Sequence, residues 1–264
     1  MSAAIAPGEI AALEAVGLGI EIGGKTICHS LSLCFGAAQC WAVLGLNGAG
    51  KTTLLHTLAG VRPPQSGEVR LDGRSLERTP RRVIARSIGL LAQDMFDAFD
   101  GTVLETALIG RHPHLSRWHW EGADDARIAM AALAEVDLDS LAARRVSTLS
   151  GGECERLAIA AVLAQQPRVW LLDEPTSHLD AHHQLLVLEL FARRAAEQGR
   201  TIVMSLHDAS LATRYCTHAL LLFEGGEALA GAAASVLNEA ALTRLYRHPI
   251  REIAADGLRL FVPR

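Results

Sequence analysis

Lysine is nearly absent from this chain: Lys25 and Lys51 are the only two among 25 basic residues. The formal net charge is −4, so the composition offers no broad basic surface for nucleic acid. No apolar run approaches the ~18 residues of a membrane span. The N-terminal residues lack a basic region and an apolar core, and we therefore expect no signal peptide.

The five cysteines are odd in number and lack the paired spacing of a metal site. We expect reduced, mostly buried thiols of a cytosolic protein. The histidine pairs His112/His114 and His182/His183 leave a metal site open, although chance clustering on exposed helices and loops is the simpler account. The sequence has no internal repeat or low-complexity segment, and its 264 residues suffice for one large domain or two small ones.

Residues 45–53, Gly-Leu-Asn-Gly-Ala-Gly-Lys-Thr-Thr, match the phosphate-loop pattern. The apolar run 41–44 predicts a buried strand before this loop, and the leucines that follow predict a helix after it. Backbone N–H groups of such a loop turn inward around an anion, and the helix N-terminus adds the positive end of its dipole. We expect Lys51 to reach the outer phosphates and the Thr52 hydroxyl to bind Mg²⁺. The expected nucleotide-binding residues of the loop are Asn47, Gly48, Ala49, Gly50, Lys51, Thr52 and Thr53.

The remaining pattern alternates strands with helices. Predicted strands are 13–22, 26–35, 68–73, 88–91, 169–172 and 201–206; predicted helices are 80–86, 102–109, 123–136, 149–165 and 181–198. Gly23-Gly24 suits a hairpin between the first two strands. The later alternation predicts a mostly parallel sheet with right-handed crossovers. Ligands bind beyond the carboxyl ends of such strands, where Gly45, Asp173 and His207 stand.

A set of motifs in chain order resembles the ATP-binding cassette ATPases: 45–53, Gln93, Leu-Ser-Gly-Gly-Glu at 149–153, Asp173-Glu174, Asp180 and His207. The Leu-Ser-Gly-Gly segment separates that family from other phosphate-loop proteins. The resemblance covers about residues 13–250. It implies an α/β fold: a RecA-like, mostly parallel core with an N-terminal antiparallel β subdomain and an inserted α-helical subdomain. We expect one domain, 1–264, with its core in 9–93 and 165–264 and the helical subdomain in 94–164.

The resemblance implies ATP and Mg²⁺ as cofactors. Asp173 resembles the acid that holds Mg²⁺ through water, and Glu174 resembles the general base that positions the attacking water. Successive side chains of a strand point to opposite sides, so the two acids can serve separate roles. Gln93 resembles the switch glutamine that senses metal and γ-phosphate, and His207 the switch histidine on the γ-phosphate. The implied metal group is Thr52, Gln93 and Asp173.

Ser150, Gly151 and Gly152 open a helix and form either a second anion site or an ordinary cap before Glu153. In the family this segment closes on the ATP of another subunit, which implies a two-fold, head-to-tail homodimer. Asp180 resembles the dimer-contact aspartate, although alone it would be only a helix cap. Many members have glutamine where Glu153 stands; some importers share the glutamate, and we expect activity to survive.

The family's adenine-stacking aromatic residue has no counterpart here. Its position aligns with Ile22, or in a register shifted by one residue with Glu21. Base recognition by stacking is therefore not expected, and the phosphates and Mg²⁺ should supply most of the nucleotide affinity.

Four further segments resemble the ATPases of iron-siderophore, haem and cobalamin importers: 109–113, 179–184, 206–208 with 212–216, and 242–249. This implies a peripheral subunit on the cytoplasmic face of the inner membrane that powers a separate permease, supplied by a periplasmic binding protein. Cobalamin or a ferric siderophore is favoured over haem. One alternative is a soluble cassette ATPase, such as one for iron–sulfur cluster assembly, against which 110–113 argues. A second alternative is a cassette ATPase that acts on nucleic acid or on ribosomes. That class is expected to have a long coiled-coil insertion or two cassettes in one chain, and the sequence has neither.

Overall fold

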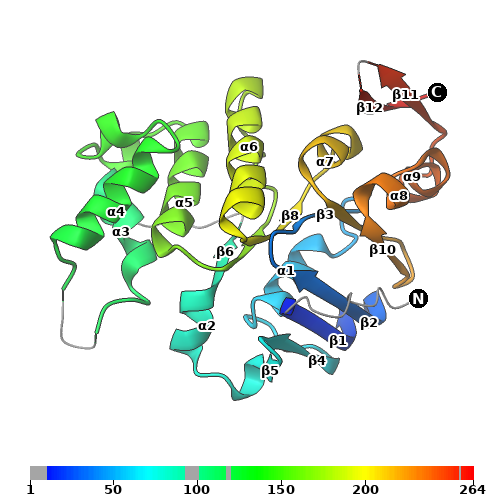
Figure 1. Cartoon of the computed structure of the whole chain (residues 1–264), viewed down its shortest axis with the longest axis horizontal. Coiled ribbons are helices and arrows are strands. Elements are labelled where there is room, and N and C mark those ends of the chain that lie inside the picture. The colour runs from blue at the N-terminus through cyan, green and yellow to red at the C-terminus, as the bar shows by residue number, and fades with distance from the viewer. Residues whose placement is uncertain (1–10, 93–100, 117–119, 256) are drawn as a thin grey trace.

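The computed structural model describes residues 11–92, 101–116, 120–255 and 257–264. Two larger sheets stand side by side with α1 (Lys51–Leu58) between them, and the antiparallel one lies along the lower edge of the view in Figure 1. The first contains the strands β1 (Ala11–Ile22), β2 (Lys25–Gly36), β4 (Ser66–Leu71) and β5 (Arg74–Ser75). Its order is β2-β1-β4-β5 and every pairing in it is antiparallel. This sheet is the predicted β subdomain, and β4 extends two residues further toward the N-terminus than the sequence pattern indicated.

The second sheet has six strands: β3 (Cys40–Leu44), β6 (Ile88–Leu91), β7 (Val169–Leu172), β8 (Thr201–Ser205), β9 (His218–Leu222) and β10 (Ala228–Ala232). Its order is β10-β9-β3-β8-β7-β6. All neighbours are parallel except β10, which pairs antiparallel with β9 at the edge. The mostly parallel sheet is thus confirmed, while β9 and β10 were not predicted.

The α-helices of the described chain are α1 (Lys51–Leu58), α2 (Arg81–Ser87), α3 (Val103–Leu108), α4 (Ala123–Ala134), α5 (Gly151–Gln165), α6 (Ala181–Gln198), α7 (Ala209–Tyr215), α8 (Ala233–Val236) and α9 (Glu239–Tyr246). Helices α3, α4 and α5 pack together as a lobe at one end of the molecule (Figure 1). A two-stranded hairpin, β11 (Ile250–Ala255) and β12 (Leu258–Pro263), closes the chain. None of the described helices is both long and apolar enough to cross a membrane.

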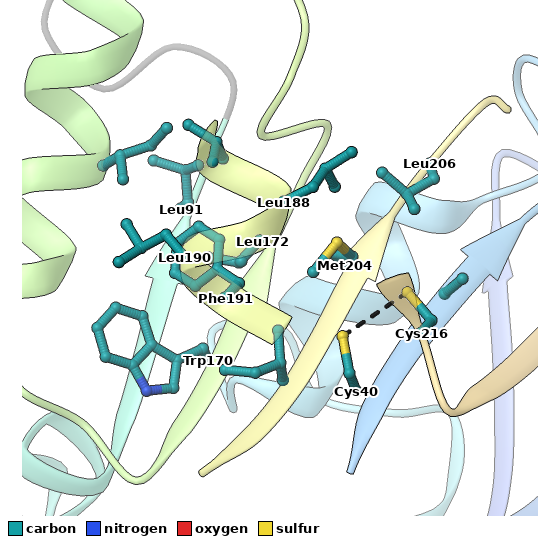
Figure 2. Close-up of a cluster of buried hydrophobic side chains, with 14 of the residues drawn as sticks. Cys40, Leu91, Trp170, Leu172, Leu188, Leu190, Phe191, Met204, Leu206 and Cys216 are labelled. Carbon is teal, nitrogen blue, oxygen red and sulfur yellow. Dashed lines mark hydrogen bonds between the residues drawn. The ribbon is translucent and has the colours of Figure 1, made fainter. Parts of the chain in front are cut away.

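The inner strands β3, β8 and β7 of the six-stranded sheet are buried on both faces. Val169 and Leu171 of β7 belong to the core shared with α1 and the antiparallel sheet, whereas Trp170 and Leu172 belong to the core beneath the helices. A strand covered on both faces has a continuous apolar sequence, as β7 does. The Trp170 indole meets Phe191 of α6 edge to face, with ring centroids 5.5 Å apart (Figure 2). This packing fixes the strand that ends at the two acids.

Candidate functional site

The phosphate loop lies between β3 and α1, as predicted. Gly50 adopts the left-handed conformation at the N-cap of α1, with φ 96° and no side-chain cap. A Cβ there would lie 2.4 Å from Ile27 Cδ1, so glycine is required on both counts. The first-turn N–H groups of α1 are left without a side-chain partner, which suits them to bind an anion.

Lys51 is buried, with 5% of its surface exposed. Its Nζ donates to the Gly45 carbonyl at 3.2 Å and lies 3.9 Å from Glu174 Oε1. Burial lowers the Lys51 pKa, while the charges of Glu174 and Asp173 oppose that shift. The ammonium group therefore stands at the junction between the phosphate loop and the acids that follow β7.

Asp173 is held by a serine that sequence reasoning missed. The Ser205 hydroxyl at the end of β8 donates to Asp173 Oδ1 at 2.7 Å, and the Glu174 N–H donates to Ser205 Oγ at 2.7 Å. Asp173 Oδ2 is buried and has no hydrogen-bond partner. A buried, unpartnered carboxylate oxygen behind the phosphate loop fits a hard cation or its water ligand. The only available signal for Ser205 was a polar residue ending an apolar strand.

Glu174 points toward the phosphate loop and His207. Its Oε1 lies 2.8 Å from His207 Nε2, and the His207 side chain is 52% exposed. The β7 strand ends at Leu172, and Glu174 has a positive φ of 50°. Both acids follow the end of β7, so the strand alternation that we predicted does not orient them, and the left-handed backbone at Glu174 sets the direction of its carboxylate. A non-glycine residue held in this conformation is typical of functional sites.

Ser150 caps α5: its side chain accepts from the Glu153 N–H, and Glu153 Oε2 accepts from the Ser150 N–H at 2.6 Å. The Ser150 hydrogen bonds hold the Glu153 pKa below its usual range. Glutamine can close the same capping box, so this exchange preserves the local structure. Gly151 is exposed, and an added Cβ would meet open space. A Cβ on Gly152 would lie 3.3 Å from the His178 carbonyl, which places this turn beside the loop after Glu174.

Asp180 caps α6, because its carboxylate accepts from the His183 N–H at 2.9 Å. The predicted cap is thus present, while a dimer contact stays a prediction.

Gln93 lies outside the described residues. Among the described residues, no three histidine, cysteine or acidic side chains are grouped to hold a metal ion. The His183 ring faces Asp180, and the His114 ring bonds the Gln165 carbonyl.

The hairpin tip lies against the phosphate loop. Ile22 ends β1 and is 42% exposed. Lys25 Nζ, across the turn, donates to the Gly48 carbonyl at 2.7 Å. Sequence reasoning did not assign Lys25 to the site. A cavity of about 190 Å³ beside this contact is lined by Lys25, Asn47 and Arg247, among others.

Known proteins that resemble this chain belong to the family whose motifs the site contains. The ABC transporter family pattern matches residues 28–177. The ferric enterobactin transport ATP-binding protein FepC of Escherichia coli K12 is 37% identical over 96% of this chain and 94% of its own. The hemin import ATP-binding protein HmuV of Myxococcus xanthus is 41% identical over 93% of each.

A solved structure shares the fold over nearly the whole chain. It is a chain of a metal-chelate type ABC transporter in an inward-facing conformation, with a TM-score of 0.84, 30% sequence identity, and coverage of 96% of this chain and 98% of that one. The phosphate loop, the paired acids and the histidine beyond β8 therefore stand on a fold shared with transporter ATPases. This chain belongs to the ABC transporter family and is an ATPase of the kind that drives transport.

Proposed function

We propose that this chain is the ATP-binding subunit of an importer for a metal chelate, acting as a homodimer on a separate membrane permease. The observation that carries the proposal is the convergence of Lys51, Glu174 and His207, with the charge of the Ser205-bonded Asp173 also acting on Lys51. The named relatives move a ferric siderophore and hemin, which supports the cargo class. Within it we favour cobalamin or a ferric siderophore over haem. The relatives do not favour a soluble cassette ATPase.

The nucleotide is proposed to bind with its phosphates against the loop 45–53. Lys51 holds the outer phosphates, and its burial strengthens that attraction. Thr52, Asp173 and Gln93 are the residues that would hold Mg²⁺, and the unpartnered Asp173 Oδ2 supports this assignment. Bound Mg²⁺ would neutralise charge on the phosphate oxygens.

Glu174 is proposed as the general base, which takes a proton from the water that attacks the γ-phosphorus. Its Oε1 already lies within 2.8 Å of His207 Nε2. His207 orients this carboxylate and, in the presence of nucleotide, contacts the γ-phosphate. The oxygen–phosphorus bond to the β-phosphate breaks as the bond to water forms, releasing ADP and phosphate.

Ser150 and Gly151 are proposed to act on the nucleotide of the partner subunit, with Gly152, Glu153 and Asp180 as further contacts. Both Ser150 and Gly151 are exposed, which leaves the turn accessible to a second copy. The partner phosphate would meet the first-turn N–H groups of α5. The assembly would lie on the cytoplasmic face of the inner membrane, and a periplasmic binding protein would supply the permease.

The test is purification of the tagged chain from detergent-solubilised membranes of its own organism, with Glu174→Gln to hold the ATP-bound state. We expect a multi-span membrane protein to purify in a fixed ratio with the chain, and addition of the purified permease to stimulate ATP hydrolysis by the unmutated chain. Recovery only as a soluble homo-oligomer, with no membrane-dependent change in ATPase rate, contradicts the importer proposal.

A further inference from the structure

The C-terminal helix contacts the backbone of the proposed catalytic histidine. Tyr246 is the last residue of α9, and its hydroxyl donates to the His207 carbonyl at 3.0 Å. The two residues are 39 positions apart in the sequence. This hydrogen bond therefore links α9, which follows β10 in the chain, to the loop that carries His207.

Core packing holds the Tyr246 hydroxyl in place, and its raised pKa keeps it protonated as a hydrogen-bond donor. Leu242 and Leu245 of the same helix are buried, and the Tyr246 ring packs against the core formed with them. Burial, and secondarily the negative charge of Asp208, raises the pKa of Tyr246 to about 12. The phenol is therefore protonated at any pH at which the enzyme is assayed, and it can donate to the carbonyl throughout.

The His207 backbone is held from both directions. On the sheet side, the Leu206 N–H donates to the Val43 carbonyl at 3.1 Å. On the other side, Asp208 caps α7 by accepting from the Ser210 N–H at 2.7 Å. The C-terminal hairpin adds a contact, because the Phe261 N–H donates to Ser210 Oγ at 3.0 Å. The Tyr246 bond lies between these anchors, at the residue whose side chain meets Glu174.

The imidazole itself has little packing to hold it, since half of the His207 side chain is exposed. Its position relative to Glu174 therefore depends strongly on the backbone from which it projects. We propose that Tyr246 is a positioning residue for ATP hydrolysis: its hydroxyl fixes the His207 carbonyl so that Nε2 meets the Glu174 carboxylate. This inference rests on the role proposed above for His207.

The test compares Tyr246→Phe with Tyr215→Phe in the full chain. These are the two tyrosines of the protein, and the Tyr215 hydroxyl faces Glu189 instead of the site. Phenylalanine keeps the ring packing and removes one hydrogen bond. We expect kcat of Tyr246→Phe to fall about three- to tenfold, with an unchanged KM for ATP and a full complement of folded protein by circular dichroism. Tyr215→Phe should keep the unmutated kcat.

A double-mutant cycle with His207→Ala separates positioning from general packing. If Tyr246 acts through His207, Tyr246→Phe causes no further loss of kcat in the His207→Ala background. An equal loss in both backgrounds, or a wild-type kcat for Tyr246→Phe while His207→Ala is impaired, overturns the positioning role and leaves the proposed function intact. A wild-type kcat for His207→Ala overturns both the role of His207 and that of Tyr246.

Discussion

His207 Nε2 lies 2.8 Å from Glu174 Oε1, although the two residues follow different strands, β8 and β7. These strands are parallel neighbours, so their carboxyl ends meet at one edge of the sheet. The left-handed turn at Glu174 then directs its carboxylate across that edge toward the histidine. Sheet topology and one backbone conformation together create the contact on which the proposed chemistry depends.

Replacement of Glu174 by glutamine should stop turnover and spare nucleotide binding. The amide keeps the size of the carboxylate but cannot accept the proton of the attacking water, and general-base catalysis is worth ~10²–10⁴-fold in rate. Single-turnover hydrolysis and an ATP dissociation constant measure the two effects. Glu197→Gln, on the exposed side of α6, is the matched control and should hydrolyse ATP normally. A normal rate in Glu174→Gln would refute the general-base role.

Ser205→Ala should destabilise the fold and weaken the site together. Ser205 is fully buried, and its hydroxyl serves both Asp173 and the Glu174 N–H. Alanine leaves these groups unsatisfied, which costs about 1–3 kcal/mol of unfolding free energy for each buried group left without a partner. Chemical denaturation measures this loss, and Ser235→Ala, at an exposed position, should show none. Equal unfolding free energies for both variants would mean that the hydroxyl bonds contribute nothing net.

Much of this arrangement could be predicted from local patterns. The apolar runs before Gly45 and Asp173 identify buried strands, and the capping residues Thr102 and Ser150 mark helix starts that the structure confirms. Ser205 and Tyr246 could not be found in this way, because their partners lie 32 and 39 residues away and only tertiary packing brings them together.

Three of the unpredicted strands share a cause, whereas β9 has a buried apolar run at 219–222 that the sequence analysis missed. β10, β11 and β12 pair antiparallel at an edge or in an isolated hairpin, with residues that are mostly exposed or half-buried. Such strands need no continuous apolar run, and β10 even contains a glycine, Gly231, which pairs with Ala219 of β9. Their existence depends on a neighbour to pair with, which is a property of the fold and not of the local sequence.

Gly151→Asp should fold normally and fail only in the assembled enzyme. A side chain at Gly151 meets open space within the subunit, so the monomer accommodates it. In the proposed dimer the carboxylate faces the partner's γ-phosphate, and like charges repel. We expect near-normal ATP binding by the monomer and at least a tenfold loss of hydrolysis, for a repulsion of about 1.4 kcal/mol or more.

Mixing Gly151→Asp with Lys51→Ala tests whether the two segments act across the dimer. A mixed dimer contains one site with an intact phosphate loop and an intact Ser150 segment, and one site with both defects. We expect hydrolysis to rise above that of either variant alone and to peak near equal concentrations. Activity that never exceeds the sum of the separate variants, despite subunit exchange shown by a differently tagged partner, contradicts action in trans.

Ile22→Tyr should strengthen ATP binding. Ile22 ends β1 at the hairpin, and 42% of its surface is exposed, so a larger side chain there has room. Stacking a base on an aromatic ring is worth ~1–3 kcal/mol, whereas isoleucine offers no π-face. In the proposed site the affinity comes mainly from phosphate contacts, which are the same for ATP and GTP. Lys25 supports the loop there through its hydrogen bond to the Gly48 carbonyl. We therefore expect native dissociation constants for ATP and GTP within tenfold of each other, and tighter ATP binding by Ile22→Tyr.

The control for Ile22→Tyr is Ile253→Tyr, at an equally exposed position on β11, which should bind ATP as the native chain does. A native preference for ATP above tenfold, together with no change in Ile22→Tyr, would show that the adenine is recognised elsewhere in the fold.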